Sequence, residues 1–363
     1  MRGIPLLSVF LGVVVAAFAG PRRKVIIDQD AFGPGGPNLH PIVMVLQSPD
    51  VEVLGITIES GDGWQKENVA HALRLLEIVG RTDVPVVPGA TFPLVNSPEA
   101  TRRWESRYGK LAYKGAWTEE WPAGTVKRRP VHPPDVVPPS PEGAPSTKPL
   151  AETADAFLGR KVREFPGEVS ILALGPLTNL ALALKRDPGF APLAKEIVIM
   201  GGSFNPHAMG NEFDAEHIHN PRLEFNFRWD PEAADAVLRA PWAKVTLAPI
   251  DPTTRTLFTP ELIKRIGAAD TPVARYVARH VEGFPMWDEL ATAVWLKPDL
   301  VTRREVLAVG VDIGIDGAAY GSTLSWPAGK GPGRGERDMA VVFEVDVSKL
   351  ESLVANLLTG NPH

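Results

Sequence analysis

The stretch that decides the fold is residues 24–40, K-V-I-I-D-Q-D-A-F-G-P-G-G-P-N-L-H. After Lys24 comes the β-branched run Val25-Ile26-Ile27, which is typical of a buried strand. Asp28 and Asp30 follow, and because alternate residues of a strand share a face, their carboxylates project together if the strand extends that far. The glycines and prolines at 33–37 exclude a helix or a central strand and predict a loop.

The residues of this stretch leave two interpretations open. Open parallel α/β sheets bind ligands beyond the carboxyl ends of their strands. There, the two aspartates and the amide of Asn38 would offer oxygen ligands to a hard cation such as Ca²⁺. Alternatively, Asp28 and Asp30 accept hydrogen bonds from nearby backbone in an Asx-type turn.

Composition places the chain among ordinary globular proteins. Its 363 residues are 44% hydrophobic and 22% charged, which is enough to bury a large core. The net charge is −5 and there is no long basic run, so nucleic-acid binding has little electrostatic support. Cysteine is absent, which excludes disulfides, a thiolate nucleophile and cysteine-ligated zinc.

Residues 1–19 are predicted to be a signal peptide. Arg2 gives a short positive region, residues 4–18 are apolar, and Ala17-Phe18-Ala19 matches a small-x-small cleavage site. An uncleaved membrane anchor is the alternative, but the apolar run is short for it. We expect an exported protein, periplasmic or secreted, whose remaining domain spans residues 20–363 and is not inserted in a membrane after processing.

Strand and helix patterns alternate along most of the chain. Apolar runs predict strands at 51–58, 84–87, 169–174, 196–200, 245–250, 306–313 and 339–345. Helical spacing and capping residues predict helices at 41–47, 65–79, 153–165, 178–184, 260–266, 287–295 and 347–358, with another opening at Asp230-Pro231-Glu232. This order predicts an α/β fold, with a Rossmann-like, mostly parallel sheet and helices on both faces. No repeat or linker divides it, so we expect one large domain.

Residues 91–150 interrupt the alternation. Aromatic residues are dense between positions 104 and 121, and nine prolines follow between 122 and 149. We expect a long surface segment, partly polyproline-like over 122–149. Either it is a lid whose aromatic rings stack on a planar ligand, or those rings attach the segment to the domain surface.

A set of ordered motifs resembles one known family, the inosine/uridine-preferring nucleoside hydrolases. The resemblance covers most of residues 24–345. It rests on Asp28-Gln29-Asp30, Ser48-Pro49-Asp50, Val53-Leu54-Gly55-Ile56-Thr57, and the stretches 73–79, 80–86, 174–181, 199–202, 224–226 and 230–234. No single motif is decisive, but the ordered set is specific.

The resemblance implies an activity and a set of site residues. Members hydrolyse the N-glycosidic bond of ribonucleosides to ribose and free base, with one Ca²⁺ at the base of the pocket. Asp30 matches the aspartate that binds the metal and activates water. The implied metal ligands are Asp28, Asp30, Asn38, the carbonyl of Leu174, and Asp288. The implied substrate-binding residues are Asp62, Glu224, Asn226 and Asn220.

The chemistry of these residue types agrees with those roles. The candidate ligands supply only oxygen, which Ca²⁺ prefers. A bound cation lowers the pKa of its water, so that a carboxylate can deprotonate it near neutral pH. Nearby carboxylates stabilise an oxocarbenium-like transition state. Glu224 and Asn226 are two residues apart and would face one pocket if that segment is extended.

Two positions depart from the family pattern. The family usually reads Asp-x-Asp-Pro-Gly-x-Asp-Asp, whereas here Pro37-Asn38 occupies the place of the last two aspartates. We therefore expect weaker metal binding and altered ribose contacts. Trp287 stands where purine-acting members often have a histidine that protonates the leaving base. The remaining histidine candidates, expected to be surface residues more often than acids, are His40, His71, His217 and His219.

The sequence thus favours a Ca²⁺-dependent hydrolase of nucleosides or related ribosyl compounds. Two alternatives stay open: a non-catalytic Ca²⁺-dependent sugar- or nucleoside-binding protein on the same scaffold, and a hydrolase of another glycoside. The expected partner is a small ribosyl compound, and homo-oligomerisation is left open.

Overall fold

One sheet forms the centre of the protein. The computed structural model describes residues 21–120, 130–210, 212–281 and 283–360. In these residues nine strands form a sheet of order β3-β2-β1-β4-β5-β6-β9-β7-β8. They are β1 (Arg23–Gln29), β2 (Val51–Ile58), β3 (Val86–Pro88), β4 (Val169–Ala173), β5 (Glu196–Met200), β6 (Val245–Ala248), β7 (Val301–Val311), β8 (Thr323–Pro327) and β9 (Arg337–Val345). Only the pairs that include β7 are antiparallel, so the predicted mostly parallel sheet is confirmed.

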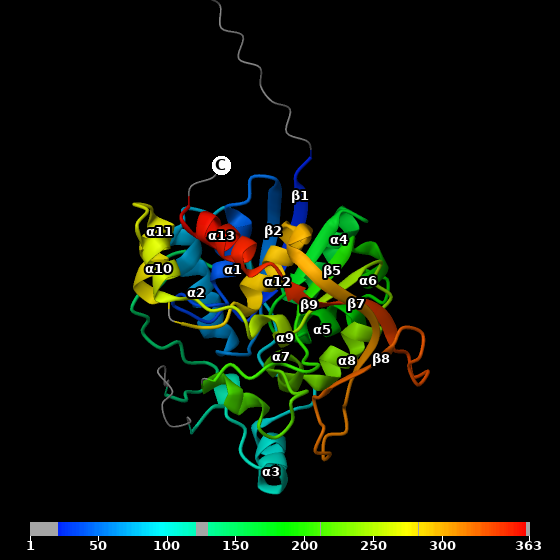
Figure 1. Cartoon of the computed structure of the whole chain (residues 1–363). Coiled ribbons are helices and arrows are strands. Elements are labelled where there is room, and N and C mark those ends of the chain that lie inside the picture. The colour runs from blue at the N-terminus through cyan, green and yellow to red at the C-terminus, as the bar shows by residue number, and fades with distance from the viewer. Residues whose placement is uncertain (1–20, 121–129, 211, 282, 361–363) are drawn as a thin grey trace, which may run out of the picture.

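Helices cover both faces of this sheet. They are α1 (His40–Leu46), α2 (Gln65–Ile78), α3 (Pro98–Tyr108), α4 (Ala154–Glu164), α5 (Thr178–Arg186), α6 (Phe190–Leu193), α7 (Phe225–Trp229), α8 (Pro231–Arg239), α9 (Ile250–Thr253), α10 (Pro260–Gly267), α11 (Pro272–His280), α12 (Trp287–Leu296) and α13 (Val347–Leu358). Helices α1, α2 and α10–α13 share one core with the sheet, whereas α4–α6 and α8 share the other. Figure 1 shows the two groups on opposite sides of the strands.

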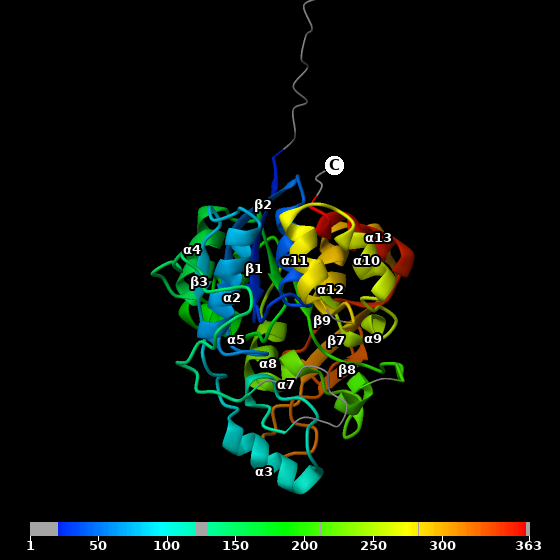
Figure 2. The same ribbon diagram turned by 90° about the vertical axis from the view of Figure 1, so that its left-hand side faces the viewer.

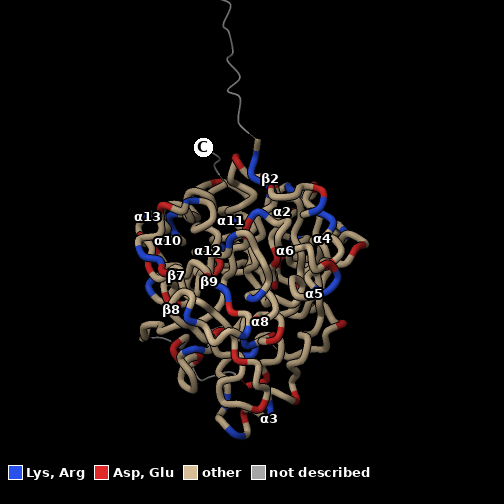
Figure 3. Tube along the Cα trace, turned by 90° about the vertical axis from the view of Figure 1, so that its right-hand side faces the viewer, with Lys and Arg blue, Asp and Glu red and all other residues tan. Residues whose placement is uncertain are grey.

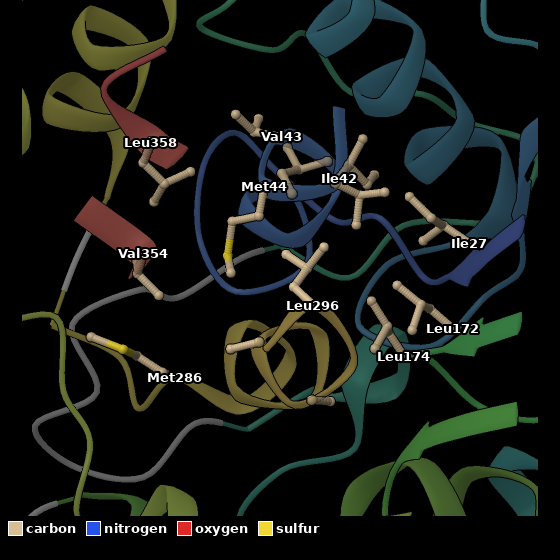
Figure 4. Packing of buried hydrophobic residues seen from close by; sticks show 14 of the residues in the cluster. Ile27, Ile42, Val43, Met44, Leu172, Leu174, Met286, Leu296, Val354 and Leu358 are labelled. Atoms are coloured by element: carbon tan, nitrogen blue, oxygen red, sulfur yellow. The ribbon is translucent and has the colours of Figure 1, made fainter. Parts of the chain in front are cut away.

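The first core fixes the position of β1, the strand that leads to the predicted site. Ile27 of β1 and Leu172 of β4 pack toward Ile42 of α1, and Leu296 of α12 lies close by (Figure 4). Helix α12 is buried on all sides from Asp288 onward, which explains why its sequence after the first turn is apolar apart from Thr292. A helix so enclosed holds its N-terminal residues rigidly.

Two regions differ from the predicted elements. Within the 91–150 segment, Ser97 caps a regular helix, α3, with Pro98 in its first turn. The density of aromatic residues there suggested irregular structure, but Trp104 lies on the buried face of a helix whose other side chains are largely charged or polar. Strand β7 begins five residues earlier than predicted, because its first half is polar and exposed. Strand β8, helix α11 and the short helices α6, α7 and α9 carry no pattern strong enough to predict them.

The aromatic residues of this segment divide between the two proposed roles. Trp104 and Trp117 are buried and attach the segment to the domain, with Trp117 stacked on Trp229 at a 4.0 Å ring separation. Tyr113, in contrast, lines a pocket. Figure 2 shows α3 at the end of the molecule opposite to the one where the chain enters β1, so the segment lies beyond the carboxyl ends of the parallel strands.

Residues 130–149, here called the strap, are bound along one face of α2. Three acidic or histidine residues of α2 hold it, and the first two are one helical turn apart. Glu67 lies 3.1 Å from the His132 ring, and His71 lies 2.6 Å from the Glu142 carboxylate. Glu77 accepts hydrogen bonds from the backbone and hydroxyl groups of Ser146 and Thr147 at 2.7–2.9 Å. The proline-rich segment therefore has a defined path, at least from residue 130 onward.

Several predictions concern residues outside the described part of the chain. The signal peptide at 1–19 and the first part of the 122–149 segment lie there. Within the described residues, no helix is long and apolar enough to cross a membrane. Figure 3 shows Lys and Arg interspersed with Asp and Glu over the elements in that view, in keeping with the absence of a long basic run.

Replacing Glu77 by Gln is expected to loosen the strap in a pH-dependent way. Burial alone would raise the pKa of Glu77, but hydrogen bonds from Thr147, Arg74 and Ser146 outweigh it and lower the pKa to about 2. A lowered carboxylate pKa stabilises the fold above the ordinary value of 4.5, and this stabilisation is lost as the pH falls through about 2. Urea unfolding should show a larger loss for Glu77→Gln at pH 7 than at pH 3.

Glu351→Gln is the control for this experiment, because Glu351 forms no ion pair among the described residues. It is expected to unfold like the wild type at both pH values. An equal loss for Glu77→Gln at pH 7 and pH 3 would contradict the proposed role of the carboxylate.

Candidate functional site

A pocket of about 850 Å³ opens at the carboxyl ends of the parallel strands. The loops after β1, β2, β4 and β5 contribute to it, together with α7, α12 and the strap. Seven predicted site residues line it: Asp30, Asn38, Asp62, Leu174, Glu224, Asn226 and Asp288. The structure therefore brings together residues that are up to 258 positions apart in the chain.

Asp30 is the hub of the polar contacts in this pocket. It lies one residue past the end of β1, and its side chain accepts hydrogen bonds from the Asp62 backbone N–H at 2.7 Å and from Asn38 Nδ2 at 2.9 Å. A Cβ at Gly61 would lie 2.1 Å from Asp30 Oδ2, so only glycine permits this approach. Burial raises the pKa of Asp30 well above its ordinary value, and the negative charges of Asp62 and Asp288 raise it further.

Gln29 joins Asp30 to Asp288. Its Nε2 donates to Asp288 Oδ2 at 2.8 Å, while its Oε1 accepts from the Asp30 backbone N–H at 2.9 Å. Asp288 sits in the first turn of α12, and burial raises its pKa well above the ordinary value despite the hydrogen bond from Gln29. Sequence reasoning did not identify Gln29. The structure indicates its role, because the Gln29 amide is fully buried between two buried aspartates.

Glu224 and Asn226 reach the pocket from the start of α7, not from an extended segment as predicted. Glu224 is the N-cap of this helix and accepts from the backbone N–H groups of Asn226, Phe227 and Gly202 at 2.7–3.0 Å. Burial nevertheless raises its pKa to about 7. Asn226 Nδ2 donates to the Leu174 carbonyl at 3.0 Å, which ties α7 to the loop after β4. Residues two apart on a helix point in different directions, but Glu224 has the extended backbone of an N-cap, and both side chains therefore reach the pocket wall.

The structure keeps two predicted site residues away from the pocket. Asp28 is fully buried and accepts from Thr57 Oγ1 and from Asn179 Nδ2, the latter at 2.9 Å. Burial raises its pKa to about 6. The strand ends at Gln29, so the alternation that would have put Asp28 beside Asp30 no longer holds. Asn220 donates to Ser322 Oγ and does not line the pocket, so its predicted role in substrate binding has no support in this geometry.

Two histidines expected at the surface are buried. Gly36 N–H donates to His40 Nε2 at 3.2 Å, so the ring proton lies on Nδ1, which is 2.8 Å from Glu289 Oε1. His40 thereby links the loop at 33–37 to α12. His71 lines the pocket and is held by Glu142 of the strap. His219 is exposed, as expected, and its Nε2 lies 2.8 Å from the Lys110 carbonyl oxygen.

Aromatic residues form the less polar walls of the pocket. Phe213, Phe284 and Trp287 pack against one another with ring separations of 5.3–6.1 Å. Across the pocket, Tyr113 donates its hydroxyl to Asp62 Oδ1 at 2.7 Å and packs on Phe225. Phe213 carries no sequence signal, and Tyr113 is distinguished only by its place in the aromatic segment. Such walls provide flat surfaces for a planar ligand.

The polar residues of the pocket fit a hard cation by their chemistry. No cluster of three or more His, Cys, Asp or Glu side chains arranged to hold a metal exists among the described residues. The remaining predicted set has two carboxylates, an amide and a carbonyl, all oxygen donors. In the same part of the chain, neither Asp30 nor Asp288 forms an ion pair with a basic side chain. No basic side chain among the described residues therefore offsets the burial that raises their pKa values.

Comparison with known proteins matches the chain to one family. Residues 25–352 match the model of the family described as "Inosine-uridine preferring nucleoside hydrolase". The chain is 33% identical over 359 residues to Uridine nucleosidase 1 of Arabidopsis thaliana, covering 93% of this chain and 94% of that protein.

One further relative is similar in sequence, and a solved structure is similar in fold. A pyrimidine-specific ribonucleoside hydrolase of Shewanella woodyi is 29% identical over 304 residues, covering 80% of this chain and 84% of that protein. The solved structure of a plant nucleoside hydrolase has a TM-score of 0.71 and 28% identity, covering 93% of this chain and 99% of that one. The fold inferred from sequence is thus that of the family.

The bridge between the two aspartates can be tested with Gln29→Met, which keeps the size of the side chain and removes both hydrogen bonds. Leaving the Asp30 N–H and a carboxylate oxygen of Asp288 without these partners is expected to lower the free energy of unfolding by about 2–4 kcal/mol. Gln47→Met at the end of α1 is the control and should cost about 0.5 kcal/mol or less. Similar losses in the two variants, measured by urea unfolding, would show that the bridge contributes little.

Proposed function

The chain belongs to the inosine-uridine preferring nucleoside hydrolase family and is a hydrolase of N-glycosyl bonds. On that premise we propose that it is a Ca²⁺-dependent hydrolase of pyrimidine ribonucleosides, with uridine as the first substrate. The observation that carries the proposal is the convergence of Asp30, Asp288 and Glu224 on one pocket, with Asp30 held by Asn38 and by the Asp62 backbone. The products are ribose and the free base.

The substrate assignment rests on the two kinds of wall in the pocket. Asp62, Glu224 and Asn226 supply acceptors and an amide on one side, where the hydroxyl groups of a ribose require polar partners. The rings of Phe213, Phe284 and Trp287 supply a flat apolar wall for the base. Relatives named as uridine nucleosidase and pyrimidine-specific ribonucleoside hydrolase support uridine as the first substrate to test.

Asp30 is the proposed general base. Its two oxygens are oriented by separate donors, Asn38 Nδ2 and the Asp62 N–H, so the carboxylate has one defined direction toward the pocket. It would take a proton from the water that attacks the anomeric carbon of the ribose. As the bond to the base breaks, positive charge develops on the sugar ring, and the carboxylates of Asp30, Asp288 and Glu224 stabilise it.

Asp30, Asp288, the Leu174 carbonyl and Asn38 are the proposed ligands of Ca²⁺. When bound, the cation would lower the pKa of a coordinated water and balance the buried carboxylates. Asn38 donates its amide N–H₂ to Asp30, so its oxygen becomes a ligand only after the amide turns about its terminal bond. This cost, together with one charge fewer than an aspartate has, favours weak metal binding.

Export is part of the proposal. It rests on the apolar segment and the small-x-small site within residues 1–19, which lie outside the described residues. The proposed substrate would then be a nucleoside outside the cytoplasm.

Asp30→Asn is the direct test of the base. The amide keeps the shape of the side chain but cannot accept a proton, so kcat for uracil release from uridine should fall by about 10²–10⁴-fold. Asp50→Asn, at the exposed turn before β2, is the control and should keep wild-type activity. Turnover that survives in Asp30→Asn would sink the mechanism. Saturable uridine binding by the wild type without turnover would instead favour the non-catalytic alternative.

Asn38→Asp tests the metal assignment by restoring a carboxylate. The added charge and the direct oxygen ligand should tighten Ca²⁺ binding by about tenfold, since ligand charge tunes the affinity of such sites. Isothermal titration of EGTA-treated protein measures this without reference to activity. Unchanged Ca²⁺ affinity in Asn38→Asp, or full uridine hydrolysis in excess EGTA, would contradict the proposed ligand set.

A further inference from the structure

A second, smaller cavity of about 40 Å³ lies beside the main pocket. We call it the annex. It shares Tyr113, Glu224 and Phe225 with the pocket, and its far wall includes Trp117 and Arg228. None of the proposed catalytic or metal-binding roles uses Trp117 or Arg228.

Arg228 is a buried cation in this wall. Its side chain is 7% exposed and lies between the rings of Trp104 and Tyr320, with the guanidinium carbon 5.4 Å and 4.8 Å from the two centroids. Its Nε and Nη2 are buried and have no hydrogen-bond partner among the described residues. The two rings stabilise the charge, but they leave the buried Nε and Nη2 groups without hydrogen-bond acceptors among the described residues.

Trp117 adds a third unsatisfied donor. Its indole Nε1 is buried and has no hydrogen-bond partner in the part of the chain that the structure describes, while its ring stacks on Trp229. Lys114, also in the lining, is already bound to Glu105 at 2.9 Å, and both oxygens of Glu224 accept backbone N–H groups. Among the described residues that line the annex, every buried side-chain polar atom without a partner is thus an N–H donor.

We propose that the annex binds a monovalent anion of about the size of chloride. A single water would fit the volume, and Glu216 and Glu224 in the lining offer it carboxylate acceptors, but it has only two lone pairs for the three donor atoms. An anion accepts from all three donor atoms and adds to the favourable charges of Glu105 and Glu232 near Arg228. The anion would lie on the side of α7 that also presents Glu224, and so beside the proposed ribose-binding residues.

Bromide identifies the occupant directly, because it replaces chloride and gives an anomalous X-ray signal. In crystals of the full protein soaked in sodium bromide, we expect an anomalous peak within hydrogen-bond distance of Arg228 and the Trp117 indole. A water without anomalous signal at that position, or bromide bound only elsewhere on the protein, would overturn the proposal.

A solution experiment tests the same donors independently. Replacing gluconate by chloride at constant ionic strength should raise the melting temperature of the wild type by about 2 °C. Trp117→Phe keeps the ring and removes the N–H, and it should reduce this shift at least twofold; Arg228→Met should abolish it. Arg163→Met, at an exposed ion pair, should retain the full shift.

These variants remain informative if Arg228→Met folds poorly, because Trp117→Phe and the bromide map do not depend on it. A chloride shift of equal size in the wild type and in Trp117→Phe would contradict the proposal, as would no shift in the wild type.

Discussion

The structure depends on keeping two carboxyl groups buried at the carboxyl end of β1. Asp30 and Asp288 are almost inaccessible to water, and burial together with repulsion from neighbouring acidic residues raises their pKa values. Hydrogen bonds from Gln29, Asn38 and the Asp62 backbone hold these carboxylates in place but do not neutralise them. Strongly perturbed carboxyl groups in a pocket are typical of functional sites, and the proposed function uses these two as cation ligands, with Asp30 as the base.

The loop at 33–37 leads to Asn38, where the sequence was expected to depart from the family pattern, and the surrounding helices hold the loop firmly. Gly35 has a φ of +66°, a conformation that L side chains rarely adopt, and its N–H donates to the Tyr276 hydroxyl at 2.8 Å. The His40–Glu289 pair joins the end of the loop to the helix that bears Asp288. The loop that ends in Pro37-Asn38 is therefore supported at both ends by contacts with helices.

The 91–150 segment gives the pocket an extra wall. The strap is bound to α2 by residues at helical spacing, and Tyr113 brings an aromatic ring and a hydroxyl to Asp62. The segment thus serves both roles that its aromatic residues suggested, since Trp104 and Trp117 attach it to the domain while Tyr113 faces the pocket. The shape of the substrate site is consequently set partly by a region without a strong secondary-structure pattern.

The sequence by itself determined the α/β architecture, because apolar strands and amphipathic helices alternate with a clear period, and it identified Asp30, Asp288 and Glu224 through motifs with a fixed order. Local pattern could not decide which side chains share a space. Asp28 and Asp30 separate because β1 ends between them, and Gln29 proves to be the link to Asp288. The burial of His40, and of the Arg228 and Trp117 donors that have no partner among the described residues, likewise depends on segments distant in the chain. Only tertiary packing fixes such contacts, because burial and hydrogen-bond partners depend on what the rest of the chain places nearby.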